Sequence, residues 1–539
     1  MVICGLRCSD DPPGQLFNKT SAVSISFRSE PLIPSPPLTG QQVARKTAHG
    51  IFWNYVSFGL GKGLVFLTVV ILARLLTPAH FGLVALAMLA VNYLGVLKDF
   101  GLGAALIQRR QDVEEAAQTI FTLNLLLGLS LTLTTIALAP FVAVFFQEPL
   151  VTPVLRWLSL SFVLEALGSV HIVRLKRELD FRRKLIPDIG RSVLKGLVSI
   201  GLALAGFGVW SLVIGQLAGV ATAALLAWLV LPWRPRLSIN LGLAREMSKY
   251  GLSLMGLDLL AVLENNLDYL LVGRIFGNAT LGIYTMAYRL PELLGQNTLW
   301  VIAAALFPAY ASVQHQPGLL RQGFLVSLRF TAMLTIPITL GMALAAEPLV
   351  RVFFGEQWLA AIPVLRILAL LMLVTSIGFN VGDVYKAVGQ ANILIKLSLL
   401  RLALMIPALW CGTYFGLVGV ALGHLLAGLW YTGLSLWMAT RILKVGWSEF
   451  LLQLRPSGLS GLALLLLAWP TLYLTTETIP LIRLPAVMIA GAVGYLSVLW
   501  LLERETLLRA ARTIGLPGLG RKSLTSALVP SPASDGEAG

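Results

Sequence analysis

The chain has 539 residues, of which 57% are hydrophobic and only 12% are charged, and its mean hydropathy is +0.80. Soluble domains carry about 25% charged residues, so this composition excludes an ordinary soluble protein and is typical of a polytopic membrane protein. The net charge of +15 would suggest nucleic acid in a soluble protein. Here the basic residues gather in short connections between apolar segments, which argues against a nucleic-acid partner.

Residues 1–44 are polar and proline-rich, and we expect a disordered N-terminal extension there. From residue 51 onward, apolar stretches of 18 or more residues recur, each long enough to cross ~30 Å of hydrocarbon as a helix. The sequence therefore predicts an all-α membrane protein with about fourteen transmembrane helices. The predicted spans are residues 51–73, 81–106, 117–146, 154–173, 186–207, 209–231, 251–273, 282–310, 324–346, 361–385, 394–414, 416–438, 459–475 and 482–502.

The chain repeats itself at the sequence level. Three short signatures occur in the first half and return in the same order about 200 residues later. The pairs are Leu72–Gly82 with Val272–Gly282, Pro140–Glu148 with Pro348–Glu356, and Phe207–Val209 with Phe415–Leu417. We expect Gly82 and Gly282 to permit close helix approach, and the two prolines to kink or end spans. Such kinks are compatible with a role in gating.

The repeats predict two six-helix blocks, residues 45–240 and 241–455, followed by two further transmembrane helices at 456–505 and a cytoplasmic tail at 506–539. Because six is even, both blocks enter the membrane in the same direction, as parallel repeats around a central cavity do. Basic residues concentrate on one face, so we expect both termini to be cytoplasmic. Loops of about 20 residues or fewer leave no room for an extramembrane catalytic domain, and we expect no enzyme.

The predicted first helix of the second block is unusually polar, because it contains Asp258, Glu264, Asn265 and Asp268 along one stripe. Its counterpart in the first block carries Asn54 and Lys62, and Lys62 lies close to the midplane of the predicted span. An ionisable group at a helix centre costs about 2.5–3.5 kcal/mol, so it needs a partner or a water-filled cavity. We expect both helices to line the cavity, with Asp258, Glu264 and Asp268 as candidate ion-coupling residues.

Basic residues enter the predicted spans from the cytoplasmic end: Arg191, Lys195, Arg289 and Arg401. A cavity lined by these side chains, together with Lys62, Asn54 and Asn265, would attract an anionic substrate. The alternative is that the cations snorkel to headgroups or pair with acids such as Asp99, Glu165, Asp268 or Asp383. For His171 and His424 we expect packing roles.

Catalytic and metal motifs are missing from the sequence. The glycines around Lys62 lack the spacing of a phosphate-binding loop. The three cysteines, Cys4, Cys8 and Cys411, form neither a disulfide framework nor a zinc pattern. We expect no cofactor and no metal.

Several motifs together resemble the polysaccharide flippase family of the multidrug/oligosaccharidyl-lipid/polysaccharide exporter superfamily. The matching stretches are Ile71–Val84, Asp99–Gln108, Arg177–Arg182, Gly206–Leu212, Asn266–Gly273 and Tyr284 with Ala287–Leu290. The resemblance covers about residues 45–455, whereas residues 1–44 do not match.

The resemblance implies translocation of an undecaprenyl-diphosphate-linked oligosaccharide across the bacterial inner membrane, with polysaccharide polymerase and glycosyltransferases as further partners. A basic cavity fits this reading, since a diphosphate cannot cross hydrocarbon unaided. Two alternatives stay open. A drug or cation antiporter of the same superfamily would use the acidic residues, and a polysaccharide polymerase or ligase would use a large periplasmic loop, which the sequence lacks.

Overall fold

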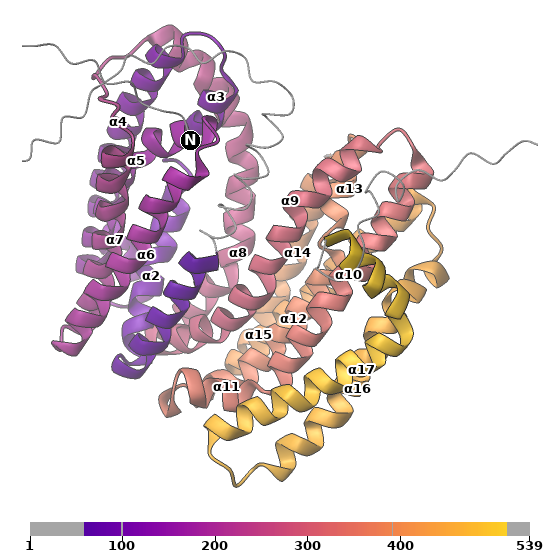
Figure 1. The fold of residues 1–539 in the computed structure, drawn as a ribbon. Coiled ribbons are helices and arrows are strands. Elements are labelled where there is room, and N and C mark those ends of the chain that lie inside the picture. Colours follow the sequence, from indigo (N-terminus) through magenta and orange to yellow (C-terminus); the bar gives the residue numbers. More distant parts are fainter. Residues whose placement is uncertain (1–58, 99–100, 391, 515–539) are drawn as a thin grey trace, which may run out of the picture. The chain divides into compact units, whose positions relative to one another are not determined.

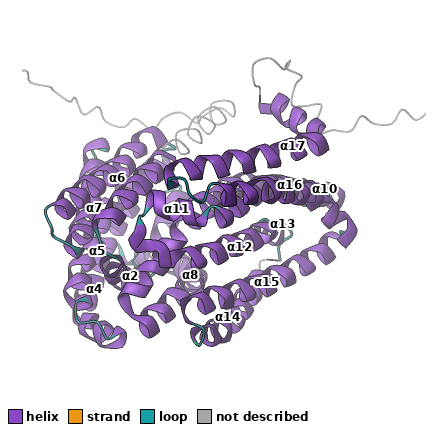
Figure 2. Cartoon of the chain, turned by 90° about the horizontal axis from the view of Figure 1, so that it is seen from below, coloured by secondary structure: helices purple, strands orange, loops and turns teal. Residues whose placement is uncertain are grey.

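Helices account for all the regular secondary structure in residues 59–98, 101–390 and 392–514, the parts of the chain that the computed structural model describes (Figure 2). These residues belong to one unit, Gly50–Gly539. The first described segment, residues 59–75, is helical. The first half then contains α2 (Pro78–Gly95), α3 (Leu102–Gln108), α4 (Val113–Phe146), α5 (Val151–Arg177), α6 (Phe181–Leu204) and α7 (Val209–Val230).

The second half begins with α8 (Leu241–Leu290), which consists of two helical segments that meet at a kink at Gly277 (Figure 1). It continues with η1 (Pro291–Gln296), α9 (Asn297–Ser312), α10 (Pro317–Leu344), α11 (Ala346–Phe353), η2 (Glu356–Ala361), α12 (Ile362–Gly378), α13 (Val381–Ala387), α14 (Asn392–Thr413) and α15 (Gly416–Leu443). The last two helices are α16 (Trp447–Leu474) and α17 (Pro480–Ile514).

Local sequence signals explain where several of these helices begin. The Asp180 carboxylate caps α6 by accepting a hydrogen bond from the Arg183 backbone N–H at 3.0 Å. The Asn240 side chain caps α8 by accepting from the Gly242 N–H at 2.9 Å. Each cap satisfies a donor that a helix N-terminus otherwise leaves unpaired.

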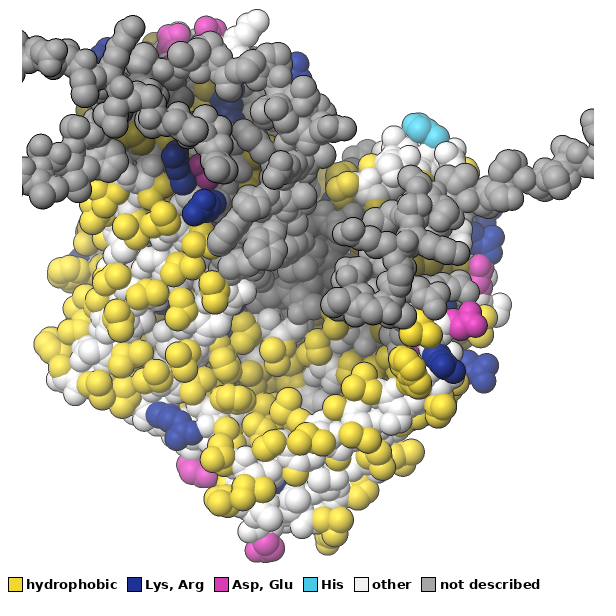
Figure 3. Space-filling model, viewed as in Figure 1, with side chains coloured by type: hydrophobic (Ala, Val, Ile, Leu, Met, Phe, Trp, Pro, Cys, Tyr) yellow, Lys and Arg dark blue, Asp and Glu magenta, His cyan; other side chains and the backbone are white. Residues whose placement is uncertain are grey.

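Ten of the described helical segments are long and apolar enough to cross a membrane. Figure 3 shows broad fields of hydrophobic side chains on the surface, with few charged side chains among them. The lateral surface of α4 illustrates this, since Phe141 and Val144 are more than 70% exposed. Water would penalise such surface, whereas lipid tails accept it. The protein is therefore a multi-pass membrane protein.

The structure departs from the predicted spans at several places. The predicted span 81–106 divides into α2 and α3. The predicted span 361–385 lies within a single candidate span, Glu356–Ala387, in which a turn separates α12 from α13. The predicted spans 251–273 and 282–310 both overlap α8, and they are separated by a break at Gly277, whose backbone is non-helical with a φ of +80° that glycine readily adopts. Predicted span 186–207 lies on a helix but is not among the ten, and 51–73 is only partly described. The number fourteen thus stays a prediction.

The expected effects of the prolines were partly right. Pro140 lies inside α4, which continues to Phe146 without ending. Pro348 lies in the first turn of the short helix α11, after α10 has ended at Leu344. Only the second proline therefore follows the end of a span.

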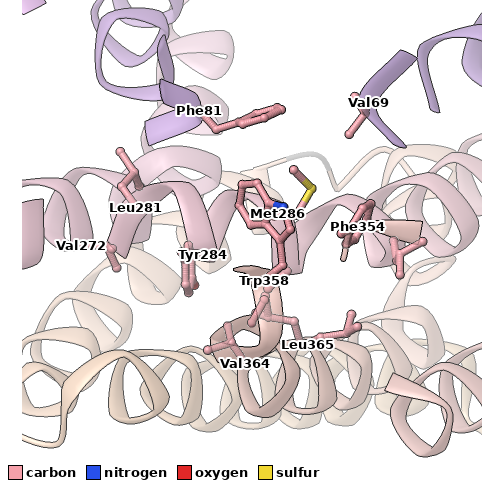
Figure 4. Packing of buried hydrophobic residues seen from close by; sticks show 14 of the residues in the cluster. Val69, Phe81, Val272, Leu281, Tyr284, Met286, Phe354, Trp358, Val364 and Leu365 are labelled. Carbon is pink, nitrogen blue, oxygen red and sulfur yellow. The ribbon is translucent and has the colours of Figure 1, made fainter. Parts of the chain in front are cut away.

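Neighbouring helices pack mostly as antiparallel pairs: α4 with α5, α6 with α7, α14 with α15, and α16 with α17. The long helix α8 joins the halves, because it packs on α2 and α4 as well as on α12, α14 and α15. The largest buried hydrophobic cluster draws on both halves. In Figure 4, Val69 and Phe81 of the first half face Leu281, Met286 and Trp358 of the second.

The helices α2 and α8 cross at the two repeat-related glycines. A Cβ atom added to Gly82 would overlap the carbonyl oxygen of Asn278, and a Cβ added to Gly282 would overlap the carbonyl oxygen of Pro78. Each glycine thus meets the segment four residues before the other. Such a reciprocal contact is what a local twofold axis produces at a crossing. The predicted parallel relation of the two whole halves stays a prediction.

Candidate functional site

A cavity of about 700 Å³ lies among helices of both halves. Ligand pockets commonly have about 300–1,000 Å³. Its walls come from residues 65–72, α2, α6 and α7 in the first half and from α8, η1, α9 and α12–α15 in the second. Polar groups are frequent on these walls, among them Asn92, Ser192, Ser199, Gln216, Asn265, Asn266, Thr285, Thr375, Thr432 and Ser435.

Three basic side chains line the cavity, and they differ in their partners. Arg401 of α14 lies 3.1 Å from the Glu264 carboxylate, and Arg289 of α8 lies 3.6 Å from Glu292. Lys195 of α6 has no carboxylate within ion-pair distance among the described residues. Three cations against two carboxylates leave one positive charge on the wall, and that charge is on Lys195.

The Arg401–Glu264 pair connects two helices of the second half. Glu264 is only 8% exposed, and one of its carboxylate oxygens has no hydrogen-bond partner in the described structure. The Arg401 guanidinium also lies 5.1 Å from the centre of the Tyr431 ring, a cation–π distance. This geometry holds Arg401 in place and leaves one carboxylate oxygen available to another donor.

Asp268 lies behind the wall rather than on it. Its carboxylate is 1% exposed and accepts a hydrogen bond from the Tyr284 hydroxyl at 2.8 Å. The Nδ1 atom of His424 lies 3.3 Å from the same carboxylate, and His424 itself lines the cavity. This approach gives His424 a polar neighbour, and the expectation that His424 has a packing role stays a prediction. His171, in contrast, is buried and stacked on Trp228.

The remaining predicted site residues are placed differently. Asn265 lines the cavity. Arg191 is not on the wall, because it lies 3.4 Å from Glu165, an alternative that the sequence left open. Lys62 is half-buried on the first described helix but does not line the cavity, and Asp258 is exposed outside it. Asn54 lies outside the described residues.

Sequence reasoning missed two groups on the wall. Glu292 follows Pro291 in the π-helical turn η1, and its carboxylate approaches Arg289 from three residues away. Tyr288 places its aromatic ring 6.3 Å from the His424 ring, and Tyr269 lies beside Tyr288 with ring centroids 5.6 Å apart. The i,i+3 spacing of Arg289 and Glu292 was a signal that could have revealed the first of these.

One end of the cavity is closed by contacts that cross between the halves. The Arg74 guanidinium donates to the carbonyl oxygen of Val352, and the Trp358 indole N–H donates to that of Ala73 at 2.8 Å. Phe81 and Trp358 also meet edge to face, with ring centroids 5.4 Å apart. The end of the first described helix is thus held by the segment that follows α11.

The repeat-related residues make the converse contacts. Arg274, the counterpart of Arg74, lies 5.4 Å from the Phe145 ring of the first half. The Asn278 amide donates to the Glu148 carboxylate at 2.9 Å. Each half therefore contacts the other at the same end of the cavity. From this end the cavity wall extends along α2, from Phe81 to Asn92.

Among residues 59–98, 101–390 and 392–514, no group of three His, Cys, Asp or Glu residues could hold a metal ion. The chemistry available on the cavity wall is therefore that of cations, amides, hydroxyls and two neutralised carboxylates. Such a wall can replace part of the hydration of an anion with fixed donors. Those donors lie within the membrane-spanning part of the protein.

Two solved structures share this fold. The lipid II flippase MurJ in an inward closed conformation matches with a TM-score of 0.68 at 15% identity, over 85% of this chain and 100% of that chain. An inward-facing multidrug resistance MATE family transporter of the MOP superfamily matches with a TM-score of 0.53 at 18% identity, over 72% and 94%. At these identities the likeness concerns the fold.

Sequence relatives share most of the chain. The succinoglycan biosynthesis transport protein ExoT of Rhizobium meliloti is 28% identical over 66% of this chain and 72% of its own length. The lipopolysaccharide biosynthesis protein WzxC of Escherichia coli is 27% identical over 76% and 84%. The family model for polysaccharide biosynthesis proteins matches residues 71–363, more than half of the sequence. This chain belongs to the polysaccharide biosynthesis protein family.

Proposed function

We propose that the protein is a flippase that moves an undecaprenyl-diphosphate-linked oligosaccharide across the bacterial inner membrane for surface polysaccharide synthesis. The observation that carries this proposal is the cavity with surplus positive charge inside a membrane-spanning helix assembly. Burying an isolated charge in hydrocarbon costs tens of kcal/mol by Born estimates. Fixed donors on the cavity wall would lower that cost for a diphosphate, while the prenyl tail stays in lipid.

The named functions of the relatives support the same conclusion. ExoT is named a biosynthesis transport protein, and MurJ is named a lipid II flippase. Among the cavity residues, Lys195 is the primary contact for the diphosphate, with Arg289, Arg401 and Asn265 adding donors. Because Arg289 and Arg401 are already paired with carboxylates, an incoming anion competes with Glu292 and Glu264 for them. Polysaccharide polymerase and glycosyltransferases would supply or consume the cargo on either side.

The proposed mechanism is alternating access between the two six-helix blocks, residues 45–240 and 241–455. The reciprocal contacts of Arg74 and Arg274 close one end, and these must break when the cavity opens there. We assign the closed end to the periplasm, since the basic connections lie at the other end, and this orientation makes both termini cytoplasmic. Cysteines introduced at Arg182 and Asn278 test this orientation with a membrane-impermeant thiol reagent in intact cells. Labelling of the cysteine at Arg182 without labelling of the cysteine at Asn278 would reverse the assignment.

Reconstitution in liposomes with a fluorescent lipid-linked sugar tests the function directly. Wild type should increase flipping over empty liposomes, and Lys195→Ala should lose most of this increase. Exporting each negative charge gains about 2.3 kcal/mol per 100 mV, so an imposed potassium-diffusion potential of one sign should accelerate flipping. Equal rates with and without protein would refute the proposed function, whatever the potential.

A drug or cation antiporter is the second candidate, favoured by the buried carboxylate of Asp268. Its neighbour Glu264 argues against a free cation site, because Arg401 already neutralises it. Asp268 fits better as an ion-coupling residue beside His424. If Asp268→Asn abolishes the dependence on an ion gradient while flipping persists, coupling is supported. Cation efflux without lipid flipping would favour the antiporter.

A further inference from the structure

A second cavity lies on the outer side of the α14–α15 pair. This groove has a volume of about 730 Å³, and its lining includes Leu400 and Leu404 of α14 and Trp430, Gly433 and Trp437 of α15. Trp430 is 72% exposed, and α14 is the least buried of the ten candidate spans. The described helices leave the groove uncovered, so it faces the membrane.

Basic side chains stand at one end of the groove. The two helices run antiparallel and approach closely at Gly412 and Gly419, so the start of α14 and the end of α15 lie at the same end. One turn beyond Leu400 toward that end lies Lys396, which is exposed. One turn beyond Trp437 lies Arg441, whose guanidinium is 4.1 Å from the centre of the Trp437 ring.

We propose that the groove is a binding site for an anionic diacyl phospholipid. One acyl chain lies along the leucines and tryptophans, and the headgroup phosphate is bound by Lys396 and Arg441. An apolar groove alone would suit any lipid, including the prenyl tail of the cargo. The two cations at its end select a negatively charged headgroup, because each such cation near the membrane surface increases the affinity for an anionic lipid about fivefold.

The bound lipid would touch the cavity wall from behind. Leu400 and Trp430 face the groove, whereas their chain neighbours Arg401 and Tyr431 line the central cavity and lie 5.1 Å apart. A lipid that packs between α14 and α15 on the outside therefore stabilises the arrangement that holds Arg401 toward Glu264. The site is separate from the proposed cargo cavity, and it would exist whatever the protein transports.

Native mass spectrometry of the purified full-length chain tests the headgroup preference. The probes are phosphatidylglycerol and phosphatidylcholine with identical acyl chains. Wild type should retain more phosphatidylglycerol than phosphatidylcholine. The double variant Lys396→Gln/Arg441→Gln should have an affinity for phosphatidylglycerol about 30-fold lower, as expected from the loss of two surface cations. Arg455→Gln on α16 removes an exposed cation outside the groove and should leave the preference unchanged.

Filling the groove tests its location. A Cβ at Gly433 has no atom within 4 Å, so Gly433→Leu should occupy the groove without disturbing the fold and should reduce binding of both lipids. Gly458→Leu on α16, also in open space, is the matched control. Equal retention of the two lipids by wild type would show that the groove binds annular lipid without headgroup preference, which would contradict the proposal. A loss with Gly433→Leu but none with the charge variants would assign the groove to an uncharged chain and overturn the proposal.

Discussion

The closed end and the cavity show opposite relations between the two halves. At the closed end the halves contribute repeat-related residues in reciprocal contacts, as with Gly82 and Gly282. In the cavity they differ. The first half supplies Lys195, which has no carboxylate partner in the described part of the chain, while the second half supplies Arg289 and Arg401 with their own carboxylates. The closed end thus has contacts that are alike in the two halves, whereas the charges of the cavity wall are distributed unequally between them.

The largest expected effect comes from filling the glycine crossing. Gly82→Val and Gly282→Val each place a side chain against backbone atoms of the other helix. The overlap cannot be relieved by a side-chain rotation, because the atoms it meets are backbone atoms. Both should abolish flipping, and to the same extent if the contact is truly reciprocal. Folding is followed by size-exclusion chromatography in detergent. The control is Gly341→Val on α10, where a Cβ meets open space, and unequal effects at the two crossing positions would break the symmetry argument.

The next effect concerns the paired cations of the cavity. Arg401→Ala leaves Glu264 buried without its partner, which should cost about 3–5 kcal/mol of stability. Arg289→Ala should cost about 0–1 kcal/mol, since Arg289 and Glu292 are both more exposed. Thermal unfolding in detergent measures both. Adding Glu264→Gln to Arg401→Ala should restore much of the loss, and no rescue would show that packing on Tyr431 dominates.

Lys195→Ala should mainly affect transport. Losing a hydrogen bond to a charged group costs about 1.5–3 kcal/mol, so the apparent affinity for a lipid-linked diphosphate should fall roughly 10- to 100-fold. Lys195→Arg should retain part of the activity, because the charge remains while its shape changes. Arg191→Ala should change the affinity less, because the Arg191 side chain is paired with Glu165 outside the cavity. A larger loss of affinity with Arg191→Ala than with Lys195→Ala would indicate that the anion binds away from the cavity wall.

The smallest effect should come from the two arginines of the closed end. Arg74→Ala removes a hydrogen bond to a carbonyl oxygen and should shift the population toward the open state by about 1 kcal/mol, or fivefold. Arg274→Ala removes a cation–π contact and should shift it by about 0.5 kcal/mol. Thiol labelling of Asn265→Cys in a background without native cysteines reports both shifts. A larger effect at Arg274 would reverse the order of strength inferred for the two contacts.

Several features of the cavity could be predicted from single residues. A charged side chain within a span needs a partner or water, and this alone directs Lys195, Arg289, Arg401 and Glu264 to a shared interior. The same rule does not distinguish a cavity wall from another shielded position, so it could not decide whether Lys62 and Arg191 line the cavity. Arg191 satisfies it by pairing with Glu165.

The sequence by itself determined that the protein is helical, spans a membrane and carries related signatures in its two halves, because hydropathy and local spacing are properties of short segments. Only the tertiary structure decided which charges neutralise one another. Glu264 and Arg401 are 137 positions apart, and Asp268 and His424 are farther apart still. Their pairing depends on how the long helix α8 packs against α14 and α15, and such packing arises from side-chain shapes distributed over the whole fold rather than from any local pattern.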